Sequence, residues 1–239
     1  MIKIENVVLP SSEQWKAIIM GTRNPMNSWS RSDTEYDIDF VDDSVWPHKN
    51  EHYDAFIGPN DHDLMMRLVK GGPVHAKYRR MITVYMDITA PLYWWKEFST
   101  YKVGTVANSC STMHKIADKK FTLEDFSHEH LVDREDTYIY SGTCEEFIGP
   151  KETLEVIIDM LNESRREYLE TKDKKYWWQM IQLLPSSYNQ KRTVMLNYEV
   201  LANIYKSRKD HRLDEWREFC KWIEELPYSE IVTGKECEV

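Results

Sequence analysis

A basic cluster near residue 208 is the part of this chain best suited to bind a phosphate. It is formed by Lys206, Arg208, Lys209 and Arg212. A guanidinium can grip two phosphate oxygens at once, so the cluster is a candidate phosphate clamp. Cations are also favoured at helix ends by the helix dipole, so a solvated helix terminus is the alternative interpretation. The cluster alone leaves both interpretations open.

Other reactive residue types lack the surroundings that common catalytic sites require. Ser109, Cys110 and Ser111 are nucleophile types, but no G-x-S-x-G turn encloses them. His128 and His130 flank an acidic residue, a pattern that is more often a solvated surface than a metal site. The chain contains no G-x-G-x-x-G, G-x-x-x-x-G-K-[ST] or H-E-x-x-H motif. We therefore expect no metal site and no phosphate loop.

Two aromatic runs offer flat surfaces, at residues 93–95 and 176–178. Such rings can stack on a planar ligand, but core or subunit-interface packing is the interpretation that we favour. The chain holds 9 Trp, 14 Tyr and 7 Phe, which is consistent with large buried interfaces.

Hydrophobic periodicity predicts the elements that position these residues. Residues 2–9 and 82–88 alternate apolar and polar side chains, which is typical of strands. Helical spacing predicts helices at about 13–20, 64–69, 92–98, 150–168, 190–208 and 213–225. The segments 22–60 and 118–150 are polar or charged, and we predict an extended excursion for the first and irregular structure for the second. Helices outnumber strands, so the predicted class is α+β, with a single domain over 1–239.

Composition excludes several classes of protein. With 239 residues, 41% of them hydrophobic, the chain can bury a core, which excludes a disordered tail. A net charge of −9 argues against a general binder of nucleic-acid polymers or membrane surfaces. No stretch approaches the roughly 18 apolar residues of a membrane helix. Four scattered cysteines, Cys110, Cys144, Cys220 and Cys237, form no C-x-x-C pair, which favours a reduced, cytoplasmic protein.

Two segments taken together resemble the flavin-dependent thymidylate synthases, the ThyX family. The first runs from Ala90-Pro91 through a helical stretch to His114. It is similar to the family's strand, Ala-Pro-like turn and helix leading into R-H-R-x-x-S-x-N-E-x-S-x-R-Y. The second begins at Leu184-Pro185 and is similar to the family's L-P, N-x-R-x-L-x-x-F-x-x-x-R pattern. The spacing from Pro185 to its matching polar residues has no gap, and the resemblance spans roughly 60–120 and 150–225.

The resemblance implies a ThyX-like fold, with a central mixed or antiparallel sheet flanked by helices, and a homotetramer. It also implies reductive methylation of the pyrimidine nucleotide dUMP to dTMP. Methylenetetrahydrofolate would supply the carbon, NADPH the reducing equivalents, and FAD would carry the hydride. No protein nucleophile is needed for this reaction.

Cofactor-binding residues follow from the matched positions. The resemblance places Asn197 and Asn203 toward the flavin, with Lys102 and Asn108 near it. In isolation, each asparagine is equally well explained as an ordinary polar position of a helix.

Substrate-binding and catalytic residues follow in the same way. Arg208 would face the nucleotide phosphate or the pyrimidine ring, and Ser111 would donate a hydrogen bond to the phosphate. Glu97 stands where the family has a glutamine that contacts the nucleotide. A glutamine side chain can donate and accept hydrogen bonds, whereas an ionised glutamate can only accept them.

Several basic positions of the family are replaced. Thr100-Tyr101-Lys102 stands for R-H-R, and Met113-His114 for R-Y. Glu199 and Ile181 stand where the family has arginines, and neither can grip a phosphate as an arginine does. These changes leave a second hypothesis open: an altered or inactive ThyX-fold paralogue that binds a different pyrimidine nucleotide or acts as an assembly or binding protein.

Overall fold

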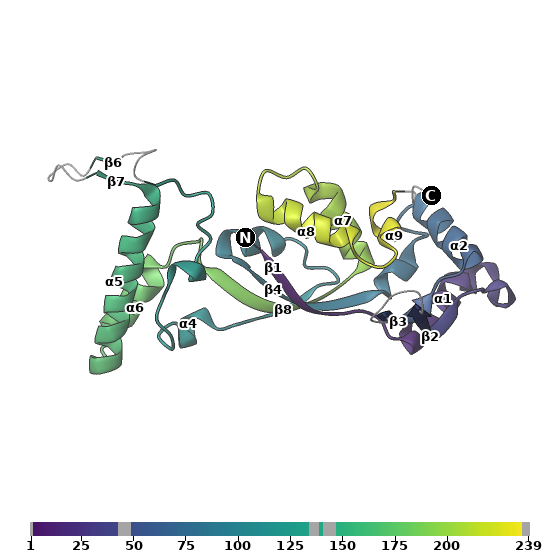
Figure 1. Ribbon diagram of the computed structural model, residues 1–239, viewed down its shortest axis with the longest axis horizontal. Helices are drawn as coiled ribbons and strands as arrows, with labels where there is room; N and C mark the ends of the chain where they lie inside the picture. Colours follow the sequence, from purple (N-terminus) through teal and green to yellow (C-terminus); the bar gives the residue numbers. More distant parts are fainter. Residues whose placement is uncertain (1, 43–48, 134–138, 141–146, 236–239) are drawn as a thin grey trace. The chain divides into compact units, whose positions relative to one another are not determined.

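The computed structural model describes residues 2–42, 49–133, 139–140 and 147–235, so Cys144 and Cys237 lie outside the described residues. Helices and an antiparallel four-stranded sheet make up an α+β fold, which confirms the predicted class (Figure 1). The strand order in the sheet is β1-β4-β8-β5. The bounds are β1 Lys3–Val8, β4 Thr83–Pro91, β5 Val106–Ser109 and β8 Asn189–Asn197.

The strand β8 corrects the predicted helix over 190–208. Residues 189–197 are extended, and α7 (Tyr198–Arg208) begins only after them. Val194 and Leu196 are buried while Thr193 and Met195 are less so, so burial alternates over residues 193–196, as a strand requires. Asn197 then accepts a hydrogen bond from the Val200 backbone N–H, and this N-cap fixes where the helix begins.

The described chain divides into two compact units. One comprises 1–3, 88–100 and 108–192, and the other 4–87, 101–107 and 193–239. Strands of the four-stranded sheet contribute residues to both units.

A helical hairpin dominates the first unit. In α5 (Pro150–Thr171), Pro150 occupies the first turn, as predicted, and α5 lies beside α6 (Lys174–Leu183; Figure 1). Helix α6 was not predicted from the sequence, although Asp173 caps its first turn. The buried core of this hairpin region contains Ile116, Ala117, Phe121, Phe126, Leu154, Ile158, Leu161 and Met180. The other elements here are α3 Leu92–Phe98, α4 Thr112–Lys115, η4 Leu123–Asp125, β6 Ile139–Tyr140 and β7 Phe147–Ile148.

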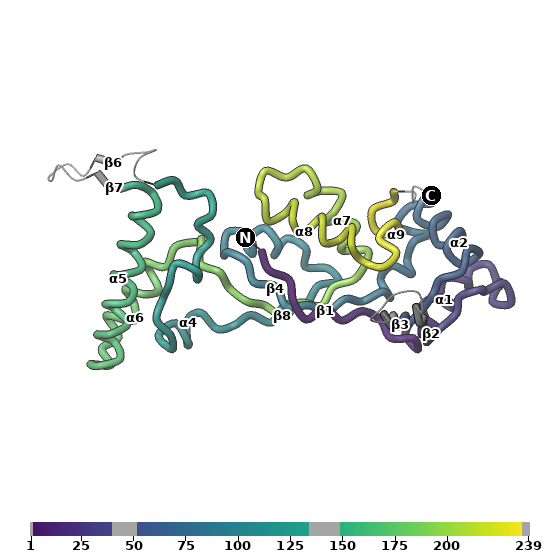
Figure 2. Tube along the Cα trace, viewed as in Figure 1, coloured from purple at the N-terminus to yellow at the C-terminus, as the bar shows by residue number. Residues whose placement is uncertain are grey.

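The second unit holds the C-terminal end of the described chain and the helices α1, α2, α7, α8 and α9. Helix α1 lies beside the β2–β3 hairpin, and α7 contacts both α8 and α9 (Figure 2). The hairpin, which pairs Glu35 with Phe56, falls within the segment predicted as an extended excursion. The bounds are α1 Ser12–Arg23, η1 Asn24–Met26, η2 Trp29–Arg31, β2 Glu35–Asp42, β3 Lys49–Phe56, α2 Pro59–Lys70, η3 Lys77–Arg80, α8 Asp214–Glu224 and α9 Ser229–Thr233.

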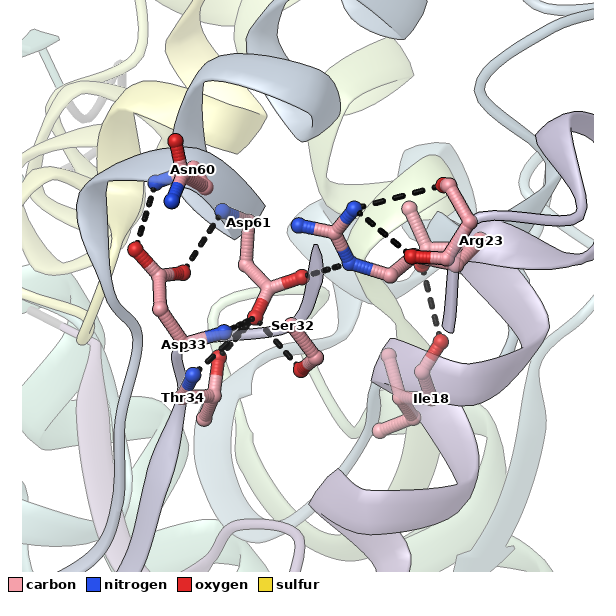
Figure 3. Close-up of polar contacts among 9 residues, drawn as sticks. Ile18, Arg23, Ser32, Asp33, Thr34, Asn60 and Asp61 are labelled. Carbon is pink, nitrogen blue, oxygen red and sulfur yellow. Dashed lines mark hydrogen bonds and ion pairs between the residues drawn. The ribbon is translucent and has the colours of Figure 1, made fainter. Parts of the chain in front are cut away.

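A buried polar network anchors the segment before this hairpin (Figure 3). One Asp61 carboxylate oxygen accepts from Arg23 Nε, and the other accepts from Ser32 Oγ at 2.8 Å and Thr34 Oγ1 at 2.7 Å. Asp33 accepts from the backbone N–H groups of Asn60 (2.9 Å) and Asp61 (3.0 Å) and so caps the start of α2. The network ties the end of α1, the 32–34 segment and α2 together.

Within the described chain, no helix is both long and apolar enough to cross a membrane.

Candidate functional site

The guanidinium of Arg208 is held in a defined orientation at the end of α7. Its Nε donates to the Tyr101 hydroxyl at 3.0 Å, and its Nη1 lies 2.9 Å from Nε2 of His211. Its Cζ lies 4.8 Å from the centre of the Trp216 ring, within the range of a cation–π contact. The side chain is half-buried, so it combines a fixed position with access from solvent. Such a preorganised fork suits recognition of an anionic or planar group.

Tyr101, His211 and Trp216 were not predicted as supporting residues. Tyr101 occupies the position where the family resemblance has a histidine, and its hydroxyl now orients the predicted arginine. Trp216 is fully buried in α8, so it forms a rigid wall for Arg208. Helical spacing placed Trp216 on the core face of its helix, but spacing alone could not predict the contact with Arg208.

The loop after Tyr101 packs against the start of α7. Gly104 adopts φ +80°, and a Cβ atom placed there would lie 3.1 Å from both Asn197 Nδ2 and Val200 Cγ2. Only glycine adopts this conformation readily and permits such a close approach. The structure thus brings the loop that carries Lys102 next to Asn197. Lys102 itself is exposed.

Asn197 has a structural role in addition to any role in binding. Its Oδ1 accepts from Val200 N at 3.1 Å, which caps α7, while its Nδ2 faces Gly104. The neighbouring Thr105 hydroxyl is buried and has no hydrogen-bond partner among the described residues. The space at Gly104 is already filled by Asn197 and Val200, so the group left for a polar cofactor such as FAD is the Thr105 hydroxyl. A buried hydroxyl without a partner fits such a group.

On α7, Asn203 is exposed to solvent, whereas Glu199 forms an ion pair. Asn203 lies on the exposed face of the helix. Glu199, which replaces an arginine of the family pattern, accepts from Arg80 at 2.5 and 3.0 Å in a two-bond ion pair. Hydrogen bonding to Glu199 raises the pKa of Arg80. The negative charge introduced at position 199 is thus paired with an arginine of η3.

Ser111 lies in the first unit, at a cavity of about 270 Å³. Its Oγ accepts from the His114 backbone N–H at 3.2 Å. Gln190 Nε2 donates to the Cys110 carbonyl at 2.9 Å and to Thr112 Oγ1 at 2.8 Å, which fixes the segment on both sides of Ser111. The cavity is lined by Thr89, Cys110, Ser111, Thr112, Lys119, Glu124, Asp125, Tyr188, Asn189, Gln190 and Lys191. The wall carries hydroxyl and ammonium groups together with the carboxylates of Glu124 and Asp125, and Lys119 pairs with Asp125, so it suits a polar ligand.

The same unit contains Glu97 and Asn108. Glu97 is half-buried near the end of α3, and Asn108 is exposed on β5. Neither of them lines the cavity at Ser111.

The aromatic run at residues 93–95 belongs to the core, as favoured from the sequence. Trp94 and Trp95 are fully buried, with ring centres 4.9 Å apart in an edge-to-face contact. Trp95 Nε1 also donates to the Gln190 carbonyl at 2.8 Å. In the second run, Trp178 is 44% exposed, so that run is only partly used for packing.

Comparison with known proteins addresses the fold. ThyX from Helicobacter pylori, solved with FAD and dUMP, matches with a TM-score of 0.62 and 13% identity over 98% of each chain. A second structure of the same enzyme with FAD and dUMP gives a TM-score of 0.57 at 14% identity. The chain has a ThyX-like fold.

A related methylase shares the architecture. The UMP/dUMP methylase PolB from Streptomyces cacaoi, bound with 5-Br UMP, gives a TM-score of 0.56 at 11% identity, covering 94% of this chain and 88% of PolB. No protein-family model matches the sequence, and no curated protein matches it. The structural matches confirm the ThyX-like architecture that the sequence predicted.

Proposed function

We propose that the chain is a flavin-dependent thymidylate synthase-like enzyme that methylates dUMP to dTMP. In the proposed reaction C5 of the uracil ring loses a proton and gains the methylene carbon of methylenetetrahydrofolate. A hydride that originates from NADPH completes the methyl group, and tetrahydrofolate leaves. FAD, when bound, supplies the hydride-carrying chemistry. NADPH and the folate are co-substrates in this proposal, and the assembly is a homotetramer of single-domain chains.

The observation that carries this proposal is the held guanidinium of Arg208. An arginine fixed by Tyr101 and placed over the Trp216 ring can donate a charge-assisted hydrogen bond to a nucleotide phosphate or a uracil carbonyl without losing much side-chain entropy. Arg208 is therefore assigned to the substrate. The full-length similarity to enzymes solved with FAD and dUMP, and to a methylase bound with 5-Br UMP, supports this choice of ligand.

The remaining predicted residues take supporting roles. Ser111 donates to the phosphate, and Glu97 contacts the nucleotide. The flavin is bound by Asn197, Asn203, Asn108 and Lys102. Thr105 extends this group, because its buried hydroxyl has no hydrogen-bond partner among the described residues.

A second candidate function rests on the lost positive charges. Met113 and Ile181 are apolar where the family pattern has arginines, and Glu199 is already paired with Arg80. A paralogue that binds a different pyrimidine nucleotide, or serves as a binding or assembly protein, is the alternative that these replacements favour.

Turnover separates the two proposals. Purified protein is incubated with FAD, NADPH, methylenetetrahydrofolate and either dUMP or UMP, and the nucleotides are analysed by mass spectrometry. The enzyme proposal predicts a product that is heavier than the substrate by one CH₂. Arg208→Ala should abolish formation of this product, whereas Lys221→Ala, which removes an exposed cation of α8, should leave it unchanged. A wild-type protein that binds FAD but yields no methylated nucleotide would favour the alternative.

A further inference from the structure

A second cavity, of about 350 Å³, lies in the first unit where α5 gives way to α6. It is lined by Met113, His114, Ile116, Ala117, Tyr168, Lys172, Lys174 and Trp177. None of the residues assigned to the proposed methylation reaction lines this cavity. Its size is in the range of small-molecule pockets.

The floor and one wall of this cavity are apolar and fixed. Ile116 and Ala117 are buried members of the hairpin core, and Tyr168 and Trp177 pack against the same cluster. Trp177 Nε1 donates to the Met113 carbonyl at 3.0 Å, which prevents the indole from rotating freely. A rigid aromatic ring beside an open volume is suited to stack a flat ligand at low entropic cost.

Two ammonium groups flank these rings. Lys172 Nζ lies 5.9 Å from the centre of the Tyr168 ring, and Lys174 Nζ lies 5.8 Å from the centre of the Trp177 ring. Lys172 terminates α5 in the left-handed conformation at φ 58°, and Lys174 is the first residue of α6. The tight connection between the two helices therefore brings both lysines to the same cavity.

No carboxylate offsets these cations within the lining. All eight lining residues belong to the described chain, and none of them is acidic. Asp173 separates the two lysines in sequence, but its carboxylate accepts from Lys175 N at 2.9 Å and pairs with Lys175 Nζ at 3.3 Å. The lining of this cavity is therefore positively charged, although the chain as a whole has a net charge of −9.

We propose that this cavity binds a small planar aromatic anion, namely an aromatic ring that carries a phosphate group. The ring stacks on Trp177, and the phosphate lies between Lys172 and Lys174. Apolar walls alone would accept a neutral ring, and ammonium groups alone would accept inorganic phosphate. The combination selects a ligand that has both parts. This binding site is additional to the proposed methylation and does not depend on it.

Isothermal titration calorimetry of the full chain tests the proposal. 1-Naphthyl phosphate is titrated beside 1-naphthol, which has only the ring, and inorganic phosphate, which has only the charge. We expect one-to-one binding of 1-naphthyl phosphate that is at least about tenfold tighter than either part, as two favourable contacts together require. 1-Naphthoate distinguishes a carboxylate site from a phosphate site and should bind more weakly. Equal affinity for 1-naphthol, or no binding of 1-naphthyl phosphate, would overturn the proposal.

Single substitutions locate the binding within the chain. Lys172→Gln and Lys174→Gln should each weaken binding of 1-naphthyl phosphate by about three- to tenfold, the usual effect of removing one partly exposed cation from an anion. Lys175→Gln is the matched control, because this neighbouring lysine pairs with Asp173 and does not line the cavity. All three lysines are exposed, so the variants should stay folded. If the control weakens binding as much as the other two variants, the ligand does not occupy this cavity.

Discussion

Replacing Asp61 with asparagine should strongly destabilise the second unit. Asp61 is 1% exposed, and Arg23, with which it pairs, is 3% exposed. One oxygen of the carboxylate accepts from hydroxyl and backbone donors of residues 32–34, so in Asp61→Asn the amide oxygen must keep that side. The amide NH₂ would then face Arg23 Nε, donor against donor. Breaking a buried pair in this way costs about 3–5 kcal/mol.

Urea unfolding followed by circular dichroism measures this cost, with the m value checked for two-state behaviour. The matched control is Asp63→Asn on the same helix, because Asp63 pairs with Arg67 at 2.9 Å while both side chains are about two-thirds exposed. That exposed pair is worth at most about 1 kcal/mol. If the unfolding free energy of Asp61→Asn lies within about 1 kcal/mol of that of the control, the buried pair does not stabilise the fold to the expected extent.

The pH dependence of the same variant provides a second test. Burial raises the pKa of Asp61, but the hydrogen bonds from Thr34, Ser32 and Arg23 together outweigh burial and leave the pKa below its usual value. A lowered folded-state pKa means that the carboxylate stabilises the fold above about pH 4 and that this stabilisation disappears as the pH falls further. The difference in unfolding free energy between wild type and Asp61→Asn should therefore narrow below about pH 4. A difference that stays constant on acidification would contradict the assignment.

Three further changes test the residues around the candidate site. Asn197→Ala should cost about 1 kcal/mol by urea unfolding because the α7 cap is lost, whereas Asn197→Asp should keep the cap and alter only flavin retention. Gly104→Ala should destabilise more than Gly72→Ala, since both have positive φ but a Cβ would meet neighbours within 4 Å only at Gly104; equal losses in unfolding free energy would show that the close approach is unimportant. Tyr101→Phe removes the hydroxyl that orients Arg208 and should weaken dUMP binding in calorimetry by roughly two- to tenfold, the effect of losing one hydrogen bond; unchanged affinity would show that this contact does not position the guanidinium.

Much of the architecture could be predicted from local sequence patterns. Alternation predicted β1 and β4, and 3.6-residue spacing predicted α1, α2, α3, α5 and α8. The stretch before α7 was wrongly predicted as helix because Val194 and Leu201 also fit a helical repeat. This stretch forms a strand because its side chains are buried alternately within the sheet, and the helix begins only after the Asn197 cap. Both features depend on tertiary neighbours, which helical spacing does not show.

The sequence predicted residue types for the candidate site, and these stay predictions, but it could not predict the contacts that those residues make. The spacing from Pro185 selected Arg208 and Asn197, and the structure places each against the segment 101–104. That Tyr101 orients Arg208, or that Arg80 pairs with Glu199, depends on residues more than 100 positions apart in sequence. Periodicity carries no signal for such contacts. The polar segment 22–60 had no predicted role, and its anchoring by Asp61 likewise arises from tertiary hydrogen bonds.

The visible absorption spectrum of the purified protein tests the central proposal most directly. The protein is incubated with FAD, desalted, and measured before and after addition of dUMP. A flavin-dependent pyrimidine-nucleotide enzyme predicts retained flavin absorbance whose bands shift when dUMP is added, and an Arg208→Ala variant that retains flavin without the shift. A protein that is colourless after desalting, with and without dUMP, would contradict the proposed function.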